Sequence, residues 1–438
     1  MNDVFPVSLV SNAHLDELTT NVRQKQISWE DFRNSEFITE EEYKVLKEYY
    51  TSTEETRAPF PEIGAILGDA IVALIDKISK VEALQQLLVL ADDVLEAQEN
   101  NAIYFHQTCA GNPKYPFSPL LKCLSKDDEF LALKSSKILT TLLCTASNDD
   151  GVDLRDFFQW IAAQLQSKNI SVSDIAVQNL ESLLKVSGFR RRFYETRNGV
   201  SSLLDLLKRN SGNPQMQYQV IFCIWLLSFE KSIAAEVSSK YDIIPIFIDV
   251  AKASVKEKVI RVIISTFKNL IEKAPEENMA SMLVHKLLSF SENLANRKWS
   301  DPDIVEDIEF LKTQLDENFQ SLTTWDEYVS ELDSGKLSWS PPHQSQQFWV
   351  QNSTRFNDND YELLRRLGRL LSTSTDPVVL AVASHDIGQY VKHYVNGKKV
   401  VQEIGAKHRI MELMAHENPD VRYQALLAVQ KLMVNAWE

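Results

Sequence analysis

The chain has 438 residues, with 46 lysines and arginines against 61 aspartates and glutamates and a formal net charge of −15. Because affinity for nucleic acid rests mainly on neutralising phosphates, and no basic stripe stands out, this charge argues against a nucleic-acid partner. The longest apolar runs, such as residues 221–227, fall far short of the roughly 20 residues of a membrane span, so we expect no direct membrane insertion. Few glycines and prolines predict a mostly helical protein.

The N-terminal part shows helix starts followed by apolar residues at helical spacing. Ser28 is predicted to cap a helix, because acidic residues follow Trp29 and acids in a first turn are favoured by the helix dipole. Thr39 and Glu42 have the spacing of a capping box. From residue 63 to 99 apolar residues recur at helical spacing almost without a break, which predicts helix pairs.

Between residues 135 and 270 one apolar pattern recurs at a nearly constant offset. The helix around Leu139 matches the helix around Leu180 at an offset of 41, and Leu180 matches Cys223 at an offset of 43. A fourth helix, around Phe267, follows at the same period. Four consecutive units of one length predict a helical repeat, with Gly199 at a sharp turn between helices.

The period loosens near residue 305, and the segments that follow are of another kind. Residues 324–328, Thr-Trp-Asp-Glu-Tyr, repeat the earlier design of hydroxyl cap, tryptophan, two acids and an aromatic residue. Residues 337–343 are predicted to be non-helical, because a residue before a proline is pushed out of the α region and Pro341 and Pro342 act in succession. The break marks a domain boundary or an extended segment packed on a surface.

The regular pattern returns in residues 377–433, where it occurs twice at an offset of 42. Each copy opens with a proline, Pro377 or Pro419, which is well tolerated in a first helical turn, and continues with apolar or small residues on one helical stripe. Gly405 is expected to allow the sharp change of direction between them. A helical unit of about 42 residues is typical of all-α solenoids of the armadillo or HEAT type, whose units must stack to bury their apolar faces.

No constellation of residues for catalysis, metal binding or cofactor binding is apparent. The sequence has no Gly-x-Gly-x-x-Gly, no phosphate loop, no His-Glu-x-x-His and no Gly-x-Ser-x-Gly. His385 and Asp386 are interpreted as an ordinary helical pair, one partly buried and one solvated. The scattered cysteines fit small buried residues in a reducing compartment, and they are Cys109, Cys123, Cys144 and Cys223. We therefore expect a protein that is not an enzyme and needs no cofactor or metal.

Two basic clusters are candidate contacts for an acidic partner. One consists of the three arginines at residues 190–192, and the other of Arg365, Arg366 and Arg369. The simpler interpretation of both is a solvated helix face or loop. Residues 358–360 resemble the start of a calcium loop but lack its later glycine and glutamate, so a helix N-cap at Asn359 or Asp360 is predicted instead.

An aromatic cluster follows the two prolines, and it consists of Trp339, Phe348 and Trp349. Core packing under an extended segment accounts for it most simply. Aromatic residues so close to two prolines also make good interface anchors. Both interpretations remain open at the level of sequence.

Several of these segments together resemble the regulatory H subunit of the vacuolar-type proton-translocating ATPase. They are residues 325–333, the string Trp339-Ser-Pro-Pro-His343, Phe348-Trp349, residues 385–388 and residues 421–431. The Trp-Ser-Pro-Pro-His string is specific, because no packing rule demands it, whereas the repeats alone support only the armadillo class. The resemblance covers the chain from about Asn21 and is strongest after Leu322.

The resemblance implies a large N-terminal armadillo-like domain, residues 1–320, and a smaller C-terminal helical domain, residues 321–438, joined by a short linker. It implies a regulatory protein that couples ATP hydrolysis to proton transport in the assembled pump and inhibits hydrolysis by the detached peripheral sector. The implied partners are the stationary peripheral stalk, the catalytic hexamer and the cytosolic part of the membrane sector. The implied location is the cytoplasm, at the cytosolic face of vacuolar and endosomal membranes.

A general armadillo adaptor is the alternative. Import receptors of that class repeat Trp-x-x-x-Asn along their groove, and here the comparable pair is Trp225 with Phe229. For the contacts with other pump components we predict three surfaces, because solenoids bind through loops and aromatic-rich extended segments. They are the linker near Gln320 to Thr323, the segment from Trp339 to Trp349, and the loop of Ser372, Thr373, Ser374 and Thr375 with the arginines Arg365, Arg366 and Arg369 beside it.

Overall fold

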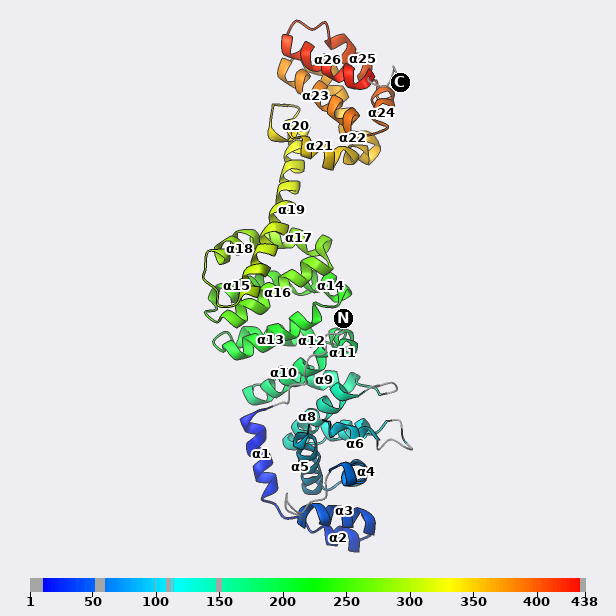
Figure 1. The fold of residues 1–438 in the computed structure, drawn as a ribbon, viewed down its shortest axis with the longest axis vertical. Coiled ribbons are helices and arrows are strands. Elements are labelled where there is room, and N and C mark those ends of the chain that lie inside the picture. Colours follow the sequence, from blue (N-terminus) through cyan, green and yellow to red (C-terminus); the bar gives the residue numbers. More distant parts are fainter. Residues whose placement is uncertain are drawn as a thin grey trace. The chain divides into compact units, whose positions relative to one another are not determined.

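The structure, a computed structural model, describes residues 11–51, 60–98, 100–107, 112, 114–146 and 152–433. All regular elements in these ranges are helices, which confirms the predicted all-α class. The chain divides into two compact units, Met1–Leu311 and Lys312–Glu438 (Figure 1). Helix α19 (Pro302–Ser334) contributes residues to both. The boundary predicted at residues 320 and 321 and the linker predicted near Gln320 to Thr323 lie further along this helix.

The first unit is a succession of helices, most of which pack on helices close to them in chain order. Their bounds are α1 (Ala13–Arg23), α2 (Trp29–Asn34), α3 (Glu40–Thr51), α4 (Phe60–Lys77), α5 (Val81–Ala97), α6 (Ala102–Gln107), α7 (Phe117–Leu124), α8 (Glu129–Thr145), α9 (Arg155–Gln164), α10 (Ile170–Lys185), α11 (Ser187–Tyr194), α12 (Gly199–Arg209), α13 (Pro214–Leu227), α14 (Lys231–Tyr241), α15 (Ile243–Ala253), α16 (Glu257–Lys273), α17 (Pro275–Val284) and α18 (Leu287–Ala295).

Helices α5, α8, α10, α13 and α16 stack on one another in that order, as Figure 1 shows. The residues that carried the predicted period, Leu139, Leu180, Cys223 and Phe267, are all fully buried. Equivalent positions in successive repeats therefore form one continuous apolar interior. The repeat predicted from the sequence is confirmed.

Buried hydrogen bonds between side chains, which we call polar rungs, also connect the repeats. Asn179 Nδ2 donates to Ser136 Oγ at 2.9 Å, between α10 and α8. Two repeats later, Asn269 Nδ2 on α16 donates to Ser228 Oγ, directly after α13, at 3.0 Å. Because each rung gives a partner to a buried amide N–H, it helps to set the register between neighbouring repeats.

The predicted helix starts are largely confirmed. Ser28 Oγ accepts from Asp31 N, and Thr39 and Glu42 bond reciprocally as a capping box, at 3.1 and 2.7 Å. The turn before α12 differs by one residue from the prediction. Asn198, with φ of +60°, adopts the left-handed conformation, which asparagine tolerates better than most residues. Gly199 instead opens α12, where an added Cβ would lie 3.0 Å from the Phe193 carbonyl oxygen.

The second unit begins in α19 and continues with shorter helices. Their bounds are α20 (Pro341–Gln344), α21 (Gln346–Asn352), the 3₁₀ helix η1 (Ser353–Asn357), α22 (Asp358–Thr373), α23 (Pro377–His393), α24 (Gly397–Glu403), α25 (Ala406–Leu413) and α26 (Pro419–Met433). The two copies of the predicted repeat are α23 and α26, and they pack against each other. Gly388 permits this approach, since an added Cβ would lie 3.1 Å from Ala428 Cα. Gly405, at φ +77°, makes the predicted turn.

Three local predictions in the second unit are wrong. Thr324 does not cap a helix, because it lies inside α19. The segment after Leu337 is extended only up to Ser340, and Pro341 starts α20, because prolines are accommodated in a first turn whose N–H groups have no helical acceptor. Asn359, Asp360 and Tyr361 have φ between +51° and +61°, so a left-handed turn replaces the predicted N-cap.

The cysteines are reduced where the structure describes them. Cys123 and Cys223 are buried, as expected, and Cys144 is partly buried. Burial raises the pKa of the Cys223 thiol well above its ordinary value, which keeps it protonated. Cys109 lies outside the described residues.

Candidate protein-interaction site

A buried polar network lies at the centre of the second unit. Tyr328 Oη, on α19, donates to Asp386 Oδ2 on α23 at 2.9 Å. The Nδ1 atom of His343, on α20, lies 2.7 Å from the same carboxylate oxygen. All three side chains are fully buried. The network therefore connects three elements that are distant in sequence through one carboxylate.

The electrostatics of this network favour a charged imidazole. Burial lowers the pKa of His343, but the hydrogen bond and charge of Asp386, with Glu331 beyond them, outweigh burial and raise that pKa above its ordinary value. Burial raises the pKa of Glu331, but hydrogen bonds from Ser340 and Ser338 outweigh it and leave that pKa lowered. The second unit thus contains a buried histidine placed between two carboxylates.

Glu331 fixes the extended segment that carries Trp339. Its carboxylate accepts from Ser338 N, from Ser338 Oγ at 2.8 Å and from Ser340 Oγ at 2.6 Å. The indole of Trp339 lies edge-on to His385, with ring centroids 5.2 Å apart, and it remains 38% exposed. An aromatic ring held in one orientation before binding is a low-cost anchor for a partner, because little side-chain entropy is left to lose.

The pair His385 and Asp386 is more specialised than the sequence suggested. Asp386, the residue predicted to be solvated or only partly buried, is fully buried in the network. His385 Nε2 lies 3.1 Å from the carbonyl oxygen of His343, and burial lowers the pKa of His385. The pair has a positioning role for α20 and Trp339, so the interpretation of an ordinary helical pair is corrected.

The three residues of the predicted aromatic cluster lie in different environments. Phe348 is 2% exposed and Trp349 is fully buried, and both belong to the hydrophobic core of the unit. Trp349 Nε1 also donates to the His343 carbonyl oxygen at 3.1 Å. The core interpretation therefore holds for these two residues, which are inaccessible to a partner in this conformation. Trp339 retains the exposed ring.

The predicted arginine cluster on α22 contains three different environments. Arg365 donates to the backbone oxygen and the carboxylate of Asp360, which holds the left-handed turn. Arg366 forms ion pairs with Asp333 and Glu362. Arg369 is exposed and has no ion pair in the described part of the chain. Of the three, Arg369 is the cation with its charge available to a partner.

The loop predicted over Ser372, Thr373, Ser374 and Thr375 is shorter in the structure, because Ser372 and Thr373 form the last turn of α22 and only Ser374 and Thr375 belong to the connection to α23. Ser372 and Thr373 donate from their hydroxyls to helical carbonyl oxygens of α22, and Ser374 Oγ accepts from Asp376 N at 3.2 Å. Thr375 is exposed. The hydroxyls of the first three residues thus form hydrogen bonds at the end of α22 and the start of α23, and the prediction of one loop over all four residues is corrected.

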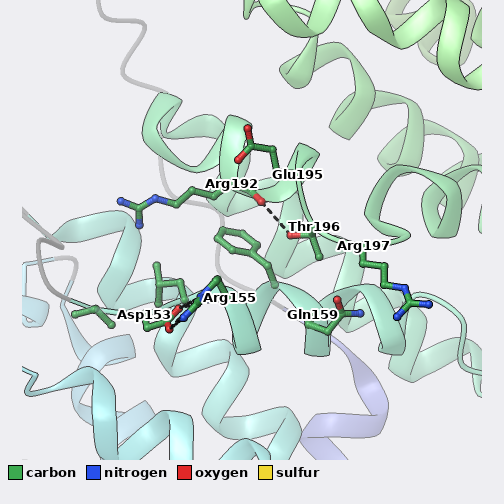
Figure 2. Close-up of a pocket in the computed structure, with 10 residues that line it drawn as sticks. Asp153, Arg155, Gln159, Arg192, Glu195, Thr196 and Arg197 are labelled. Carbon is green, nitrogen blue, oxygen red and sulfur yellow. Dashed lines mark hydrogen bonds and ion pairs between the residues drawn. The ribbon is translucent and has the colours of Figure 1, made fainter.

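The first unit has a pocket of about 550 Å³ between the start of α9 and the end of α11. Figure 2 shows Arg155, Arg192 and Arg197 around it, with Asp153 and Glu195. Asp153 forms an ion pair with Arg155. The three arginines at residues 190–192 do not form one charged surface, because Arg190 is buried and donates hydrogen bonds to the Leu184 carbonyl oxygen and to Glu230.

Two further properties of the described residues concern function. They contain no group of three histidine, cysteine or acidic side chains placed to hold a metal ion. None of their helices is both long enough and apolar enough to cross a bilayer.

Sequence reasoning missed the roles of Glu331, His343 and Asp386. His343 lies inside the specific Trp-Ser-Pro-Pro-His string, and Glu331 lies inside the preceding acidic-aromatic segment, so the sequence singled out both strings without relating one to the other. Their pairing could not be predicted, because it depends on tertiary contacts across 12 and 43 positions.

Comparisons with known proteins agree with this two-part construction. Two family models, both described as the V-ATPase H subunit, match residues 13–315 and residues 321–437. The V-type proton ATPase H subunit of Drosophila melanogaster is 36% identical over 437 residues, covering 98% of this chain and 92% of that protein. A probable H subunit of Caenorhabditis elegans is 35% identical, covering 95% and 90%, and the H subunit of Dictyostelium discoideum is 32% identical, covering 96% and 94%. Since both models together span nearly the whole chain, it belongs to the V-ATPase H-subunit family.

Proposed function

We propose that this chain is a non-catalytic regulator of a V-type proton pump, which couples ATP hydrolysis to proton transport in the assembled pump and inhibits hydrolysis by the detached peripheral sector. Membership in the H-subunit family supports the assignment to the pump. The observation that carries the regulatory role is the exposed ring of Trp339, held by Glu331 and His385 on the second unit. A fixed contact of this kind suits a protein that restrains a moving partner.

The partners in this proposal are the stationary peripheral stalk, the catalytic hexamer and the cytosolic part of the membrane sector. The working side of the second unit comprises Trp339, Arg369 and the segment at residues 372–375, which includes the end of α22. Its location is the cytosolic face of vacuolar and endosomal membranes, through the pump. Exchange of contacts by folded units, without refolding of either, accounts for switching between coupling and inhibition.

Two assays on purified components test the proposal. Adding the full chain to detached peripheral sector should lower its ATP hydrolysis, and adding it to pumps that lack it should restore ATP-driven proton transport. ATP hydrolysis by the chain alone should be absent. Unchanged rates in both assays would overturn the regulatory assignment, and turnover by the chain alone would overturn the non-catalytic one.

A further inference from the structure

The segment that carries Trp339 also contains a serine directly before a proline, Ser340 before Pro341. This pair is what proline-directed protein kinases recognise, because proline has no N–H that an apolar pocket would leave without an acceptor. The sequence contains one other such pair, Ser118 before Pro119. The same dipeptide can therefore be compared in two environments.

The backbone that leads to Ser340 has the form in which kinases bind their substrates. Residues 336–340, which we call the tryptophan segment, have no regular secondary structure, and α20 begins only at Pro341. Ser338 is exposed, Trp339 is partly exposed and Ser340 is half-buried. Because kinases bind substrates as extended chains, the tryptophan segment can enter their cleft with little rearrangement.

Ser118 lies in a different environment. It belongs to α7, and its N–H donates to the Lys114 carbonyl oxygen at 2.9 Å. The proline that follows it, Pro119, is buried. A helical serine with a buried proline does not fit an extended binding cleft, so Ser118 is the matched control for Ser340.

The hydroxyl of Ser340 helps to hold the tryptophan segment in place. It donates to Glu331 Oε2 at 2.6 Å, while Glu331 Oε1 accepts from Ser338 N and Ser338 Oγ. Gln344 Nε2 adds a hydrogen bond to the Trp339 carbonyl oxygen at 2.6 Å. Since three of these four hydrogen bonds end on one carboxylate, the position of the segment depends on Glu331.

A phosphate on Ser340 would replace an attraction to this carboxylate by a repulsion. The esterified oxygen has no hydrogen to donate, and the phosphate carries a charge of about −1.5 to −2 at pH 7. Burial raises the pKa of Glu331, but hydrogen bonds outweigh burial and lower that pKa, so the carboxylate is ionised. The charge of His343 is already shared between Glu331 and Asp386. Like charges would thus meet where a hydrogen bond now lies.

We propose that Ser340 is a phosphorylation site for a proline-directed serine kinase, and that the phosphate releases the tryptophan segment from Glu331. The kinase transfers the γ-phosphoryl group of ATP. A P–O bond forms at Ser340 Oγ, the bond to the leaving ADP breaks, and the hydroxyl proton passes to the aspartate base of the kinase. Release removes the fixed orientation of Trp339 and so weakens its contact with a partner, a step that rests on the proposed regulatory function.

Phosphate incorporation tests the site. The full chain, Ser340→Ala and Ser118→Ala are each incubated with ATP, Mg²⁺ and an active mitogen-activated protein kinase, and the phosphate is located by mass spectrometry. The wild-type chain and Ser118→Ala should both be phosphorylated at Ser340, whereas Ser340→Ala should remain unmodified. No incorporation into the folded wild-type chain, or incorporation that Ser340→Ala leaves unchanged, would overturn the assignment.

Hydrogen exchange tests the release of the tryptophan segment. The Ser338 amide should exchange at least about tenfold faster in the phosphorylated chain, because it loses its acceptor on Glu331. Glu331→Gln is the matched variant, since it keeps an oxygen acceptor but removes the charge, and phosphorylation should accelerate exchange much less in it. Equal acceleration in the two backgrounds, or none in the wild-type chain, would contradict release by charge repulsion.

ATP hydrolysis by the detached peripheral sector gives the functional readout. Half-inhibition should require about tenfold more of the phosphorylated chain than of the unphosphorylated chain, because the ring has to be ordered again on binding. Equal inhibition by the two forms would overturn the regulatory effect of the phosphate. Absence of inhibition by both forms would contradict the proposed function, whereas incorporation and exchange would still decide the phosphorylation site.

Discussion

In the first unit the helices α8, α10, α13 and α16 bury apolar side chains at equivalent positions of a repeat, whereas the second unit buries a cluster of aromatic rings around a charged network. The first arrangement spreads its stability over many similar contacts. The second concentrates it in single residues, above all Asp386, on which Tyr328 and His343 converge. Removing the same number of side-chain atoms should therefore lower the free energy of unfolding by different amounts in the two units.

The largest effect is expected at Asp386. Asp386→Ala removes the acceptor of two buried donors and leaves the His343 charge without its nearest partner, so it should lower the unfolding free energy of the second unit by about 3–5 kcal/mol. Hydrogen exchange of the α23 amides during denaturation measures this unit separately. Asp326→Ala, an exposed position on α19, is the control and should have little effect. Equal effects of the two substitutions would show that the network is not the centre of the unit.

A pH dependence should follow from His343. Because its pKa in the folded protein is raised, its contribution to stability is fully present below its unfolded pKa of about 6.5 and is lost as pH rises through the folded value. Above pH of about 6.5 the stability difference between the wild-type chain and His343→Gln should shrink by up to about 1.4 kcal/mol per pH unit. The lowered pKa of His385 acts in the opposite sense, towards acid pH, and is present in both proteins. Urea denaturation at several pH values checks this, and a constant difference would contradict it.

A single polar rung of the first unit should contribute less to stability than Asp386 does. Asn179→Ala removes the hydrogen bond to Ser136 Oγ, but that hydroxyl also donates to the Leu133 carbonyl oxygen at 2.7 Å and keeps a partner. The expected cost is about 1 kcal/mol, that of one hydrogen bond. Asn269→Ala, the equivalent change two repeats away, should cost a similar amount. A loss as large as that of Asp386→Ala, measured by hydrogen exchange of α10, would remove the contrast between the units.

The smallest effect is expected at Arg369. Since this exposed guanidinium has no ion pair in the described part of the chain, Arg369→Ala should change stability by less than about 0.5 kcal/mol. Arg366→Ala should destabilise the unit more, because it leaves Asp333 and Glu362 without their cation. Thermal unfolding of the two variants compares them directly, and the reverse order would show that the arginines have been assigned the wrong environments.

The regular part of the fold could be predicted because the apolar residues that determine it recur at a constant period. Leu139, Leu180 and Cys223 occupy the same helical face in successive repeats, and such a face has to be buried whatever its exact neighbours are. The same logic identified α23 and α26 as a stacked pair. Pro341 shows the limit, since a proline can end one element or begin the next, and only tertiary context decides between them.

The candidate site was less predictable. Trp339 and Trp349 look alike in sequence, but one is partly exposed and the other is fully buried, because α21 places Trp349 against Phe356 in the core. Asp386 appeared to be an ordinary polar residue because its partners, Tyr328 and His343, lie on other elements. Positions of this kind depend on single long-range contacts, for which neither spacing nor composition gives a signal.

The most direct test of the proposed regulatory contact is ATP hydrolysis by detached peripheral sector, titrated with the wild-type chain and with Trp339→Ala. We expect inhibition by the wild-type chain and at least about tenfold weaker inhibition by the variant, because truncating an exposed aromatic anchor removes a central contact. Val350→Ala, a 61% exposed position on α21, should inhibit like the wild-type chain. Full inhibition by folded Trp339→Ala would contradict the role assigned to this residue.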